Sequence, residues 1–498
     1  MAGAANDASA EVPAGADIDV LSTDQAGPKA IRGGAIRLVA FAVTVLLSVG
    51  SSALLFRHLK VVDSGYYATI MSLVTLCGGL TDAGLSAIGV RELATRDREG
   101  RRSLMRDLSG IRLALAALGV GAAVAFAAIV DYGSARVLGT AIAGVGMVLI
   151  VLQDTYAINL TARLQIGWLA VADVVRVAVL SLVIVVLVVA DAGLLPFYAA
   201  GIPAALSVAV LTGRLVRRDV PLMPSFRPRA WRGLLRDTVA YSLATAVIAV
   251  YFRVAIILVS LISTGQQTGY FAVSSRVIDV LLSVPPLLVG VTFPIFARAA
   301  RDDLARLSYA VGRVFDVLVI VGFGVALALS VGAPFIIVVV GGPLFHPAEA
   351  VLRIQGLALI ASFIGSVWAY TLLSLHRHRE ILITSLTALL VSIVLVGTLA
   401  SVDGARGAAI GTVISETTFV LMLTWATYRA GMRPEIAWSA LPRVVGAATL
   451  GASVLAIPDL ADVVRLALAL VLYLGGLLLL RAVPMEILEQ LPSWSRAA

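Results

Sequence analysis

The recurrence of apolar runs about twenty residues long is the feature that most restricts how this chain can fold. A helix needs ~20 mostly apolar residues to cross a bilayer, and such runs follow one another from residue 38 to residue 480 of the 498-residue chain. Fourteen of them lie at 38–56, 67–89, 110–130, 137–158, 168–190, 194–213, 238–262, 277–297, 314–339, 354–375, 381–400, 407–428, 444–457 and 463–480. The thirteenth run is the shortest and stops at Pro458.

The composition fits a chain that has lipid as its main solvent. Hydrophobic residues make up 60% and charged residues 14% of the chain, and the mean hydropathy is +0.98. A soluble domain usually has about 25% charged residues. We therefore predict an all-α polytopic membrane protein with about 14 transmembrane helices.

The distribution of basic residues predicts which ends face the cytoplasm. With a cytoplasmic N-terminus, the inner segments hold 28 of the 38 Lys and Arg residues, and the outer loops hold six. Because cytoplasmic loops are enriched in Lys and Arg, we predict a multi-pass protein of the plasma (inner) membrane with both termini in the cytoplasm. The same bias accounts for the net charge of +8, so we expect no nucleic-acid partner.

A short motif occurs twice, 204 residues apart. Residues 64–68 read Ser-Gly-Tyr-Tyr-Ala, and residues 268–272 read Thr-Gly-Tyr-Phe-Ala, each just before an inward-running span. Parallel repeats of this kind are typical of transporters. The alternative is that both copies only mark an interfacial belt of aromatic residues.

The repeat predicts two six-helix lobes of the same topology, followed by two additional C-terminal helices. The expected segments are a disordered cytoplasmic tail over 1–34, an N-terminal lobe over 35–213, a basic cytoplasmic linker over 214–236, a C-terminal lobe over 237–430, two further helices over 431–483 and a cytoplasmic amphipathic tail over 484–498.

Arginines inside the spans are the candidate substrate-binding residues. A charged side chain at the centre of a bilayer costs ~2.5–3.5 kcal/mol on insertion scales and usually faces a cavity or a partner. Arg176 and Arg276 each have an aspartate three residues away on the same helical face, so those pairs could simply neutralise one another. Arg253 has no carboxylate within four residues and is our first choice for a ligand; Arg112 is a further candidate.

Two acidic residues inside spans are candidates for ion coupling. Asp82 in the second span and Glu416 in the twelfth have no basic residue nearby in the sequence. Each could carry a coupling proton or cation. The alternative for both is a salt bridge to another helix.

Enzyme chemistry finds little support in the sequence. Neither of the two lysines, Lys29 and Lys60, stands in a Gly-Lys-[Ser/Thr] nucleotide-binding motif. The four histidines lack metal-ligand spacing, and the single cysteine, Cys77, excludes an internal disulfide. We expect no enzyme activity, no cofactor and no metal. A membrane glycosyltransferase or polymerase is the remaining enzymatic alternative, although the outer loops hardly exceed a dozen residues.

The chain resembles a known family in several short motifs. They are Phe-Arg-His-Leu-Lys at 56–60, Gly-Tyr-Tyr at 65–67, Leu-Thr-Asp-Ala-Gly-Leu at 80–85, Arg-Glu-Leu-Ala at 91–94, Gly-Tyr-Phe at 269–271, Pro-Ile-Phe-Ala-Arg at 294–298 and Gly-Ala-Arg-Gly-Ala-Ala-Ile-Gly at 404–411 with Glu416. Over about residues 33–480 it is similar to the Wzx-type oligosaccharide flippases of the multidrug/oligosaccharidyl-lipid/polysaccharide exporter superfamily.

The resemblance implies a substrate and a mechanism. It implies translocation of a polyprenyl-diphosphate-linked oligosaccharide by alternating access, with Arg253, Arg176, Arg276 and Arg112 meeting the headgroup. It also implies an ion or potential gradient as the energy source, and glycosyltransferases and a polymerase of the same pathway as partners. The alternative within the same fold is a cation-coupled multidrug exporter.

Overall fold

The fold is entirely helical in the part of the chain that can be described. The computed structural model describes residues 26–482 apart from 83, 164 and 222, and these residues form α-helices, short 3-10 helices and connecting turns. The predicted tail over 484–498 and residues 1–25 of the tail predicted over 1–34 lie outside the described residues. The first helix already begins at Ala26, inside the segment expected to be disordered.

The helices follow one another with short connections. In chain order they are α1 (Ala26–Asp82), α2 (Leu85–Thr95), α3 (Arg98–Ile129), α4 (Ser134–Ala162), α5 (Ile166–Val189), α6 (Leu194–Ala199), α7 (Gly201–Val216), α8 (Pro228–Ile262), α9 (Gly265–Leu282), α10 (Val284–Asp302), α11 (Leu304–Val340), η2 (Pro343–Phe345), α12 (Ala348–Ser374), α13 (His378–Arg429), α14 (Ala440–Ala452), η3 (Ser453–Ala456) and α15 (Asp462–Leu479).

The predicted number of membrane crossings is confirmed. Ten helical segments among the described residues are long and apolar enough to span a membrane, and shorter apolar stretches at 246–262 and 440–456 add two. Two of the ten are double, because α1 turns back at Lys60 (φ 60°, ψ −172°) and α13 turns back at Asp403 and Gly404. Counting each arm separately gives fourteen crossings.

Several crossings are interrupted where the sequence favours a break. The helical pair α9–α10 breaks at Ser283, just before Pro285 and Pro286, since proline removes backbone donors. The second arm of α1 ends at Asp82, and Gly84 (φ 68°) then starts α2. Glycine adopts this left-handed conformation without strain. The expected span 67–89 is therefore two helices.

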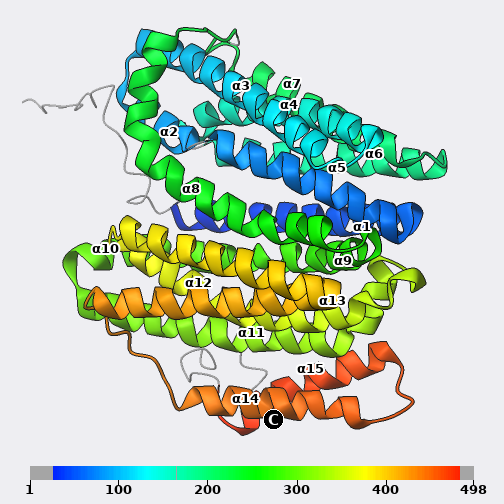
Figure 1. Cartoon of the computed structure of the whole chain (residues 1–498). Coiled ribbons are helices and arrows are strands. Elements are labelled where there is room, and N and C mark those ends of the chain that lie inside the picture. Colours follow the sequence, from blue (N-terminus) through cyan, green and yellow to red (C-terminus); the bar gives the residue numbers. More distant parts are fainter. Residues whose placement is uncertain (1–25, 83, 164, 222, 483–498) are drawn as a thin grey trace, which may run out of the picture.

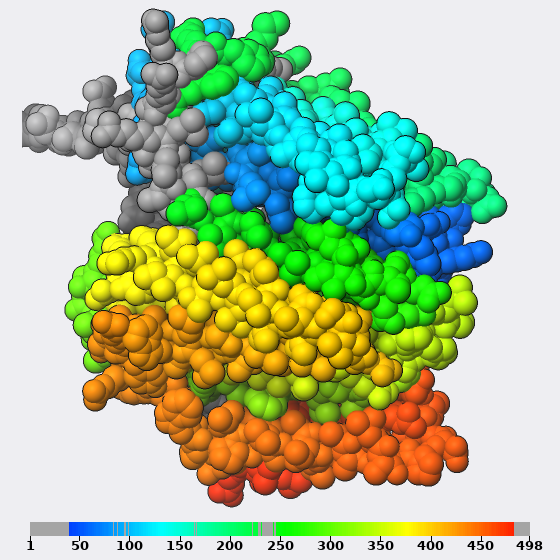
Figure 2. Space-filling view, in the orientation of Figure 1, coloured from blue at the N-terminus to red at the C-terminus, as the bar shows by residue number. Residues whose placement is uncertain are grey.

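The crossings form two groups of six and an added pair. The first lobe, α1–α7, and the second lobe, α8–α13, lie on either side of a seam along which α8 runs (Figure 1). Helices α14 and α15 pack against α11 on the far side of the second lobe. Across the seam, α1 of the first lobe packs mainly against α9 and α8 of the second lobe, and Figure 2 shows atoms of α8 on the surface where the two lobes meet.

The two ends of the bundle differ in charge. The arginine-rich segments 91–106 and 214–227 lie at one end, which we call the basic end. The turns at Lys60 and Gly404 lie at the other, which we call the opposite end. There the hydrophobic core is continuous between lobes, because Phe56 of α1 packs edge-to-face against Phe345 with ring centroids 6.3 Å apart.

Candidate functional site

Arg112 is bound to a carboxylate of a neighbouring helix. Its Nη2 donates to Asp82 Oδ1 at 2.6 Å and its Nη1 donates to Ser86 Oγ at 2.9 Å. Ser86, which α2 brings back towards α1 after the turn at Gly84, donates to Asp82 as well. Arg112 is 1% exposed and the Asp82 side chain 35%. The salt bridge, which was our alternative for Asp82, is thus present, and Arg112 is not open to a ligand in this conformation.

The ion pair between Arg112 and Asp82 is expected to contribute to the stability of the folded protein. Removing one partner of a buried ion pair costs ~3–5 kcal/mol. Since Asp82 is partly exposed, we expect Asp82→Asn to lower the free energy of unfolding by roughly 2 kcal/mol, measured by thermal denaturation in detergent. The matched control is Asp173→Asn, whose side chain is 64% exposed and lies 3.6 Å from Arg176. Equal losses in the two variants would contradict the assignment.

Arg176 belongs to a wider set of charges in the first lobe. Its Nη2 lies 3.6 Å from Asp173 Oδ1, as the spacing predicted. Asp154 of α4, which is exposed, interacts electrostatically with both Arg176 and Arg112. The carboxylates of Asp82, Asp154 and Asp173 and the guanidinium groups of Arg112 and Arg176 together carry a net charge of −1.

Arg253 has a carboxylate partner that the sequence did not suggest. Its Nη1 donates to Asp279 Oδ2 at 3.0 Å, joining α8 to α9, and the two side chains are each 34% exposed. Arg253, which has no carboxylate near it in the sequence, is thus paired across helices, and the salt bridge of Asp279 goes to Arg253, while Arg276 interacts with Asp279 only electrostatically. The pair remains accessible, so a stronger anion could still compete for the guanidinium group.

Arg276 joins the two lobes through neutral groups. Its Nε donates to Ser52 Oγ at 2.8 Å and its Nη2 donates to Ser48 Oγ, so α9 of the second lobe is bound to the first arm of α1. Among the described residues it forms no salt bridge. Arg276, Arg253 and Asp279, which we call the seam cluster, carry a net charge of +1. Within the described part of the chain, Arg276 donates to the side chains of two serines.

Glu416 is buried and surrounded by hydroxyl donors. Its residue is 8% exposed, Tyr251 donates to Oε1 at 2.8 Å and Ser362 donates to Oε2 at 3.1 Å. Within the described ranges no basic side chain pairs with it, so the salt-bridge alternative does not apply here. Because a buried charge without a counter-ion is costly, binding a proton or a cation would stabilise this site.

The repeated motif brings the lobes together at the opposite end. A Cβ atom on Gly65 would lie 2.8 Å from the backbone N of Gly269, and one on Gly269 would lie 2.0 Å from the carbonyl O of Val61. Only glycine permits this approach. The two copies of the motif are therefore in direct contact, and they close the seam at this end.

A sequence family fits this arrangement of helices. The family model described as "Polysaccharide biosynthesis protein" matches residues 54–348, which is more than half of the chain. The chain belongs to the polysaccharide biosynthesis protein family. No curated protein sequence matches it significantly.

Solved structures show a similar fold in a lipid flippase and in multidrug resistance transporters. The chain is similar to the lipid II flippase MurJ in an inward closed conformation, with a TM-score of 0.73, 13% identity, and coverage of 89% of this chain and 98% of that one. It is also similar to an inward-facing multidrug resistance transporter of the MATE family in the MOP superfamily (TM-score 0.64, 14% identity, 80% and 98% covered) and to an outward-facing one (0.54, 14%, 79% and 95%). The polysaccharide biosynthesis family member described here is thus a multi-pass membrane protein with a fold found in transporters.

Sequence reasoning missed the residues that complete this family member's candidate site. The sequence indicates Asp279 only as the aspartate three residues from Arg276, and nothing in it marks Ser48 or Ser52 as site residues. The serines are four residues apart on the inner face of an apolar run. Many membrane helices carry serines with this spacing, so the spacing alone does not identify a binding site. The role of the two serines becomes apparent only because Arg276 of the other lobe donates to both.

Proposed function

We propose that this protein is a flippase that moves a polyprenyl-diphosphate-linked oligosaccharide across the plasma membrane by alternating access, for surface polysaccharide biosynthesis. The observation that carries the proposal is the net positive seam cluster, in which hydroxyl groups of the other lobe bind Arg276. Membership of the polysaccharide biosynthesis family and the fold shared with MurJ support it.

The chemistry of the seam cluster suits a diphosphate. Hydrocarbon cannot solvate the charges of a diphosphate, and arginine offers a planar fork of donors that matches phosphate oxygens. The hydrogen bonds from Arg276 to two neutral serines are weaker than those it would make to an anion. A diphosphate entering the seam would displace the serines, form charge-assisted bonds and loosen one connection between the lobes.

The orientation and conformation fit this cycle. With the basic end in the cytoplasm, the contact of Gly65 with Gly269 closes the outer side, so the headgroup would reach the seam cluster from the inner side when the lobes separate there. The higher TM-score against the inward-facing MATE structure than against the outward-facing one agrees with this assignment. In this state a headgroup would enter from the cytoplasmic leaflet while its polyprenyl chain stays in the bilayer.

The test of the function is transport by the purified protein. Proteoliposomes carrying a fluorescent polyprenyl-diphosphate oligosaccharide in the inner leaflet report translocation through quenching by an external reagent. We expect protein-dependent movement of this lipid. A rate equal to that of protein-free liposomes would refute the proposal, as would movement of the corresponding neutral glycolipid at the same rate. Transfer of sugar onto an acceptor would instead indicate an enzyme.

Glu416 is the residue that we expect to couple transport to an ion gradient. We expect Glu416→Gln to abolish the response of transport to an imposed proton or sodium gradient, because the neutral amide exchanges no charge. Its oxygen can still accept from Tyr251, and its NH2 group can donate to Ser362, whose hydroxyl already donates to Ala358 O. Transport is measured with and without each gradient. Asp303→Asn, an exposed helix cap at the basic end, is the control. A variant that still responds to the gradient would exclude Glu416 as the coupling site.

A cation-coupled multidrug exporter is the second candidate function. The carboxylates of Asp82, Asp154 and Asp173 in the first lobe and the similarity of the fold to MATE transporters favour this function. An exporter of this kind would confer resistance to cationic drugs when it is expressed in a sensitive strain. Resistance that depends on Asp82 and Asp154, without translocation of the lipid-linked sugar, would replace our proposal.

A further inference from the structure

A second basic site lies away from the seam, between the two arms of α13 at the basic end. The cavity has a volume of about 530 Å³, within the ~300–1,000 Å³ range of ligand pockets. Its lining residues are Arg377, Arg379, Glu380, Ile383, Thr384, Met422, Trp425, Ala426, Arg429 and Ala430. The start and the end of one long helix thus form one pocket, because the chain turns back at Gly404.

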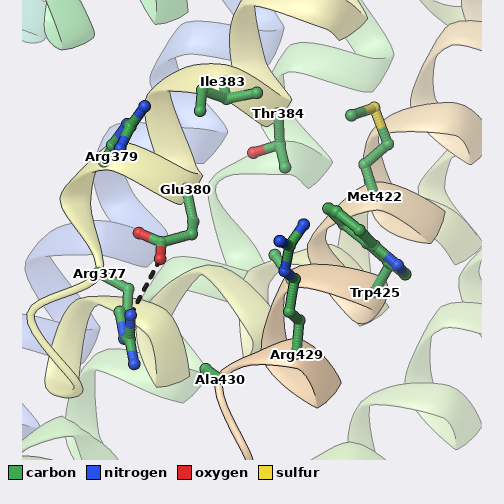
Figure 3. A pocket seen from close by; sticks show the side chains of 10 residues that line it. Arg377, Arg379, Glu380, Ile383, Thr384, Met422, Trp425, Arg429 and Ala430 are labelled. Atoms are coloured by element: carbon green, nitrogen blue, oxygen red, sulfur yellow. Dashed lines mark hydrogen bonds and ion pairs between the residues drawn. The ribbon is translucent and has the colours of Figure 1, made fainter.

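The pocket has more positive charge than its own carboxylate can neutralise. Arg377 pairs with Glu380 at 3.2 Å, while Arg379 and Arg429 form no salt bridge among the described residues. Figure 3 shows Arg429 extending from the end of α13 into the space between the arms. Its guanidinium group also lies over the Trp425 ring, 5.0 Å from the centroid. The net charge of the lining is therefore +2.

The backbone adds further hydrogen-bond donors. Helix α13 begins at His378, and no side chain caps its first turn. The first N–H groups of a helix have no partner within the helix, and its positive dipole end favours anions. Since Arg379 and Glu380 of this turn and the preceding Arg377 line the pocket, the positive end of α13 lies beside it.

An exposed apolar strip continues from the pocket along both arms of α13. It consists of Ile383, Leu386 and Leu390 on the first arm and Leu421 and Trp425 on the second, all exposed. A free anion would have no use for such a strip, whereas the acyl chains of a lipid would cover it. Basic pockets between helices at the cytoplasmic surface are suited to anionic headgroups, and tryptophan is enriched at this depth of the membrane.

We propose that the α13 pocket binds the phosphate-bearing headgroup of an anionic phospholipid of the cytoplasmic leaflet, with an acyl chain along the exposed strip. Arg379 and Arg429 would bind the phosphate, and Arg377 would contribute once its bond to Glu380 shifts. The site is separate from the seam cluster, and the lipid would hold the two arms of α13 together at the end that is farthest from Gly404.

The test uses Trp425 as a reporter of the bound lipid. The full-length protein is placed in bilayers containing brominated phosphatidylglycerol or brominated phosphatidylcholine, and the signal of Trp425 is obtained by subtracting the Trp425→Phe variant. We expect half-maximal quenching at an about five- to thirty-fold lower mole fraction of the anionic lipid. The double variant Arg379→Gln/Arg429→Gln should lose this preference. The Trp425 emission of this double variant is normalised to its own emission in bilayers without brominated lipid. This is needed because Arg429 contacts the Trp425 ring, so its replacement alone changes the emission.

Matched controls make the result decisive. Arg298 and Arg306 line a smaller pocket of about 180 Å³ at the same end, but Asp302 and Asp303 balance their charge. The double variant Arg298→Gln/Arg306→Gln should keep the preference. Equal quenching by both lipids in the wild type, or a preference that survives Arg379→Gln/Arg429→Gln, would overturn the proposal. Loss of the preference in millimolar inorganic phosphate at constant ionic strength would also overturn it, because the site would then bind a free anion.

Discussion

Arg276→Ala should reduce translocation of the polyprenyl-diphosphate oligosaccharide by about ten- to a hundred-fold. A hydrogen bond to a charged group contributes ~1.5–3 kcal/mol, and each 1.4 kcal/mol is tenfold in rate or affinity. Arg276 is the arginine of the seam cluster whose direct bonds go to serine hydroxyls, so its donors are the first that an entering diphosphate can take over. Initial rates in proteoliposomes, at several substrate concentrations, measure the effect.

Variants around Arg276 separate a role in binding from a role in packing. Arg276→Lys keeps the charge but loses the planar fork, so transport should fall less than in Arg276→Ala. The double variant Ser48→Ala/Ser52→Ala frees the guanidinium group and should bind the headgroup at least as well as the wild type does. Arg353→Ala, an exposed arginine of α12, is the control for loss of a positive charge. Unchanged translocation in Arg276→Ala would remove the seam cluster from the mechanism.

Gly269→Val should stop the transport cycle while leaving the fold intact. The added Cβ would lie 2.0 Å from the carbonyl O and 2.8 Å from Cγ1 of Val61, so the lobes cannot meet at the opposite end as they do here. The clash involves backbone atoms and cannot be relieved by rotating a side chain. We expect a protein held open at that end, with translocation reduced by more than a hundred-fold, since closing is a required step of alternating access.

Distances between spin labels measure this opening directly. Labels at Asp63→Cys and Gln266→Cys, on either side of the contact and in a Cys77→Ala background, should move apart in Gly269→Val relative to the protein without that substitution. Gly290→Val is the matched control, because a Cβ at Gly290 of α10 meets no atom within 4 Å. That variant should keep both the distance and the transport rate. An unchanged distance in Gly269→Val would show that the motif contact is not a gate.

The regular features of the fold followed from the sequence because they depend on local composition. Apolar runs of helical length are enough to place a crossing, since a backbone in lipid must satisfy its own hydrogen bonds. The turn at Lys60 lies between the first two predicted spans, 38–56 and 67–89, and the break at Ser283 lies beside Pro285 and Pro286, which remove backbone donors. The repeat of Gly65 at Gly269 was visible as well, although its direct contact was not.

The sequence by itself determined the number of helices, their alternation across the membrane and the residue types available for binding an anion. Only the tertiary structure decided which charges are neutralised. The partners of Arg112 and Arg253 lie on neighbouring helices, at Asp82 and Asp279, and the serines that bind Arg276 lie in the other lobe. Pairing between helices depends on how they rotate and pack, and in lipid many rotations bury similar apolar area, so spacing along one helix cannot reveal it.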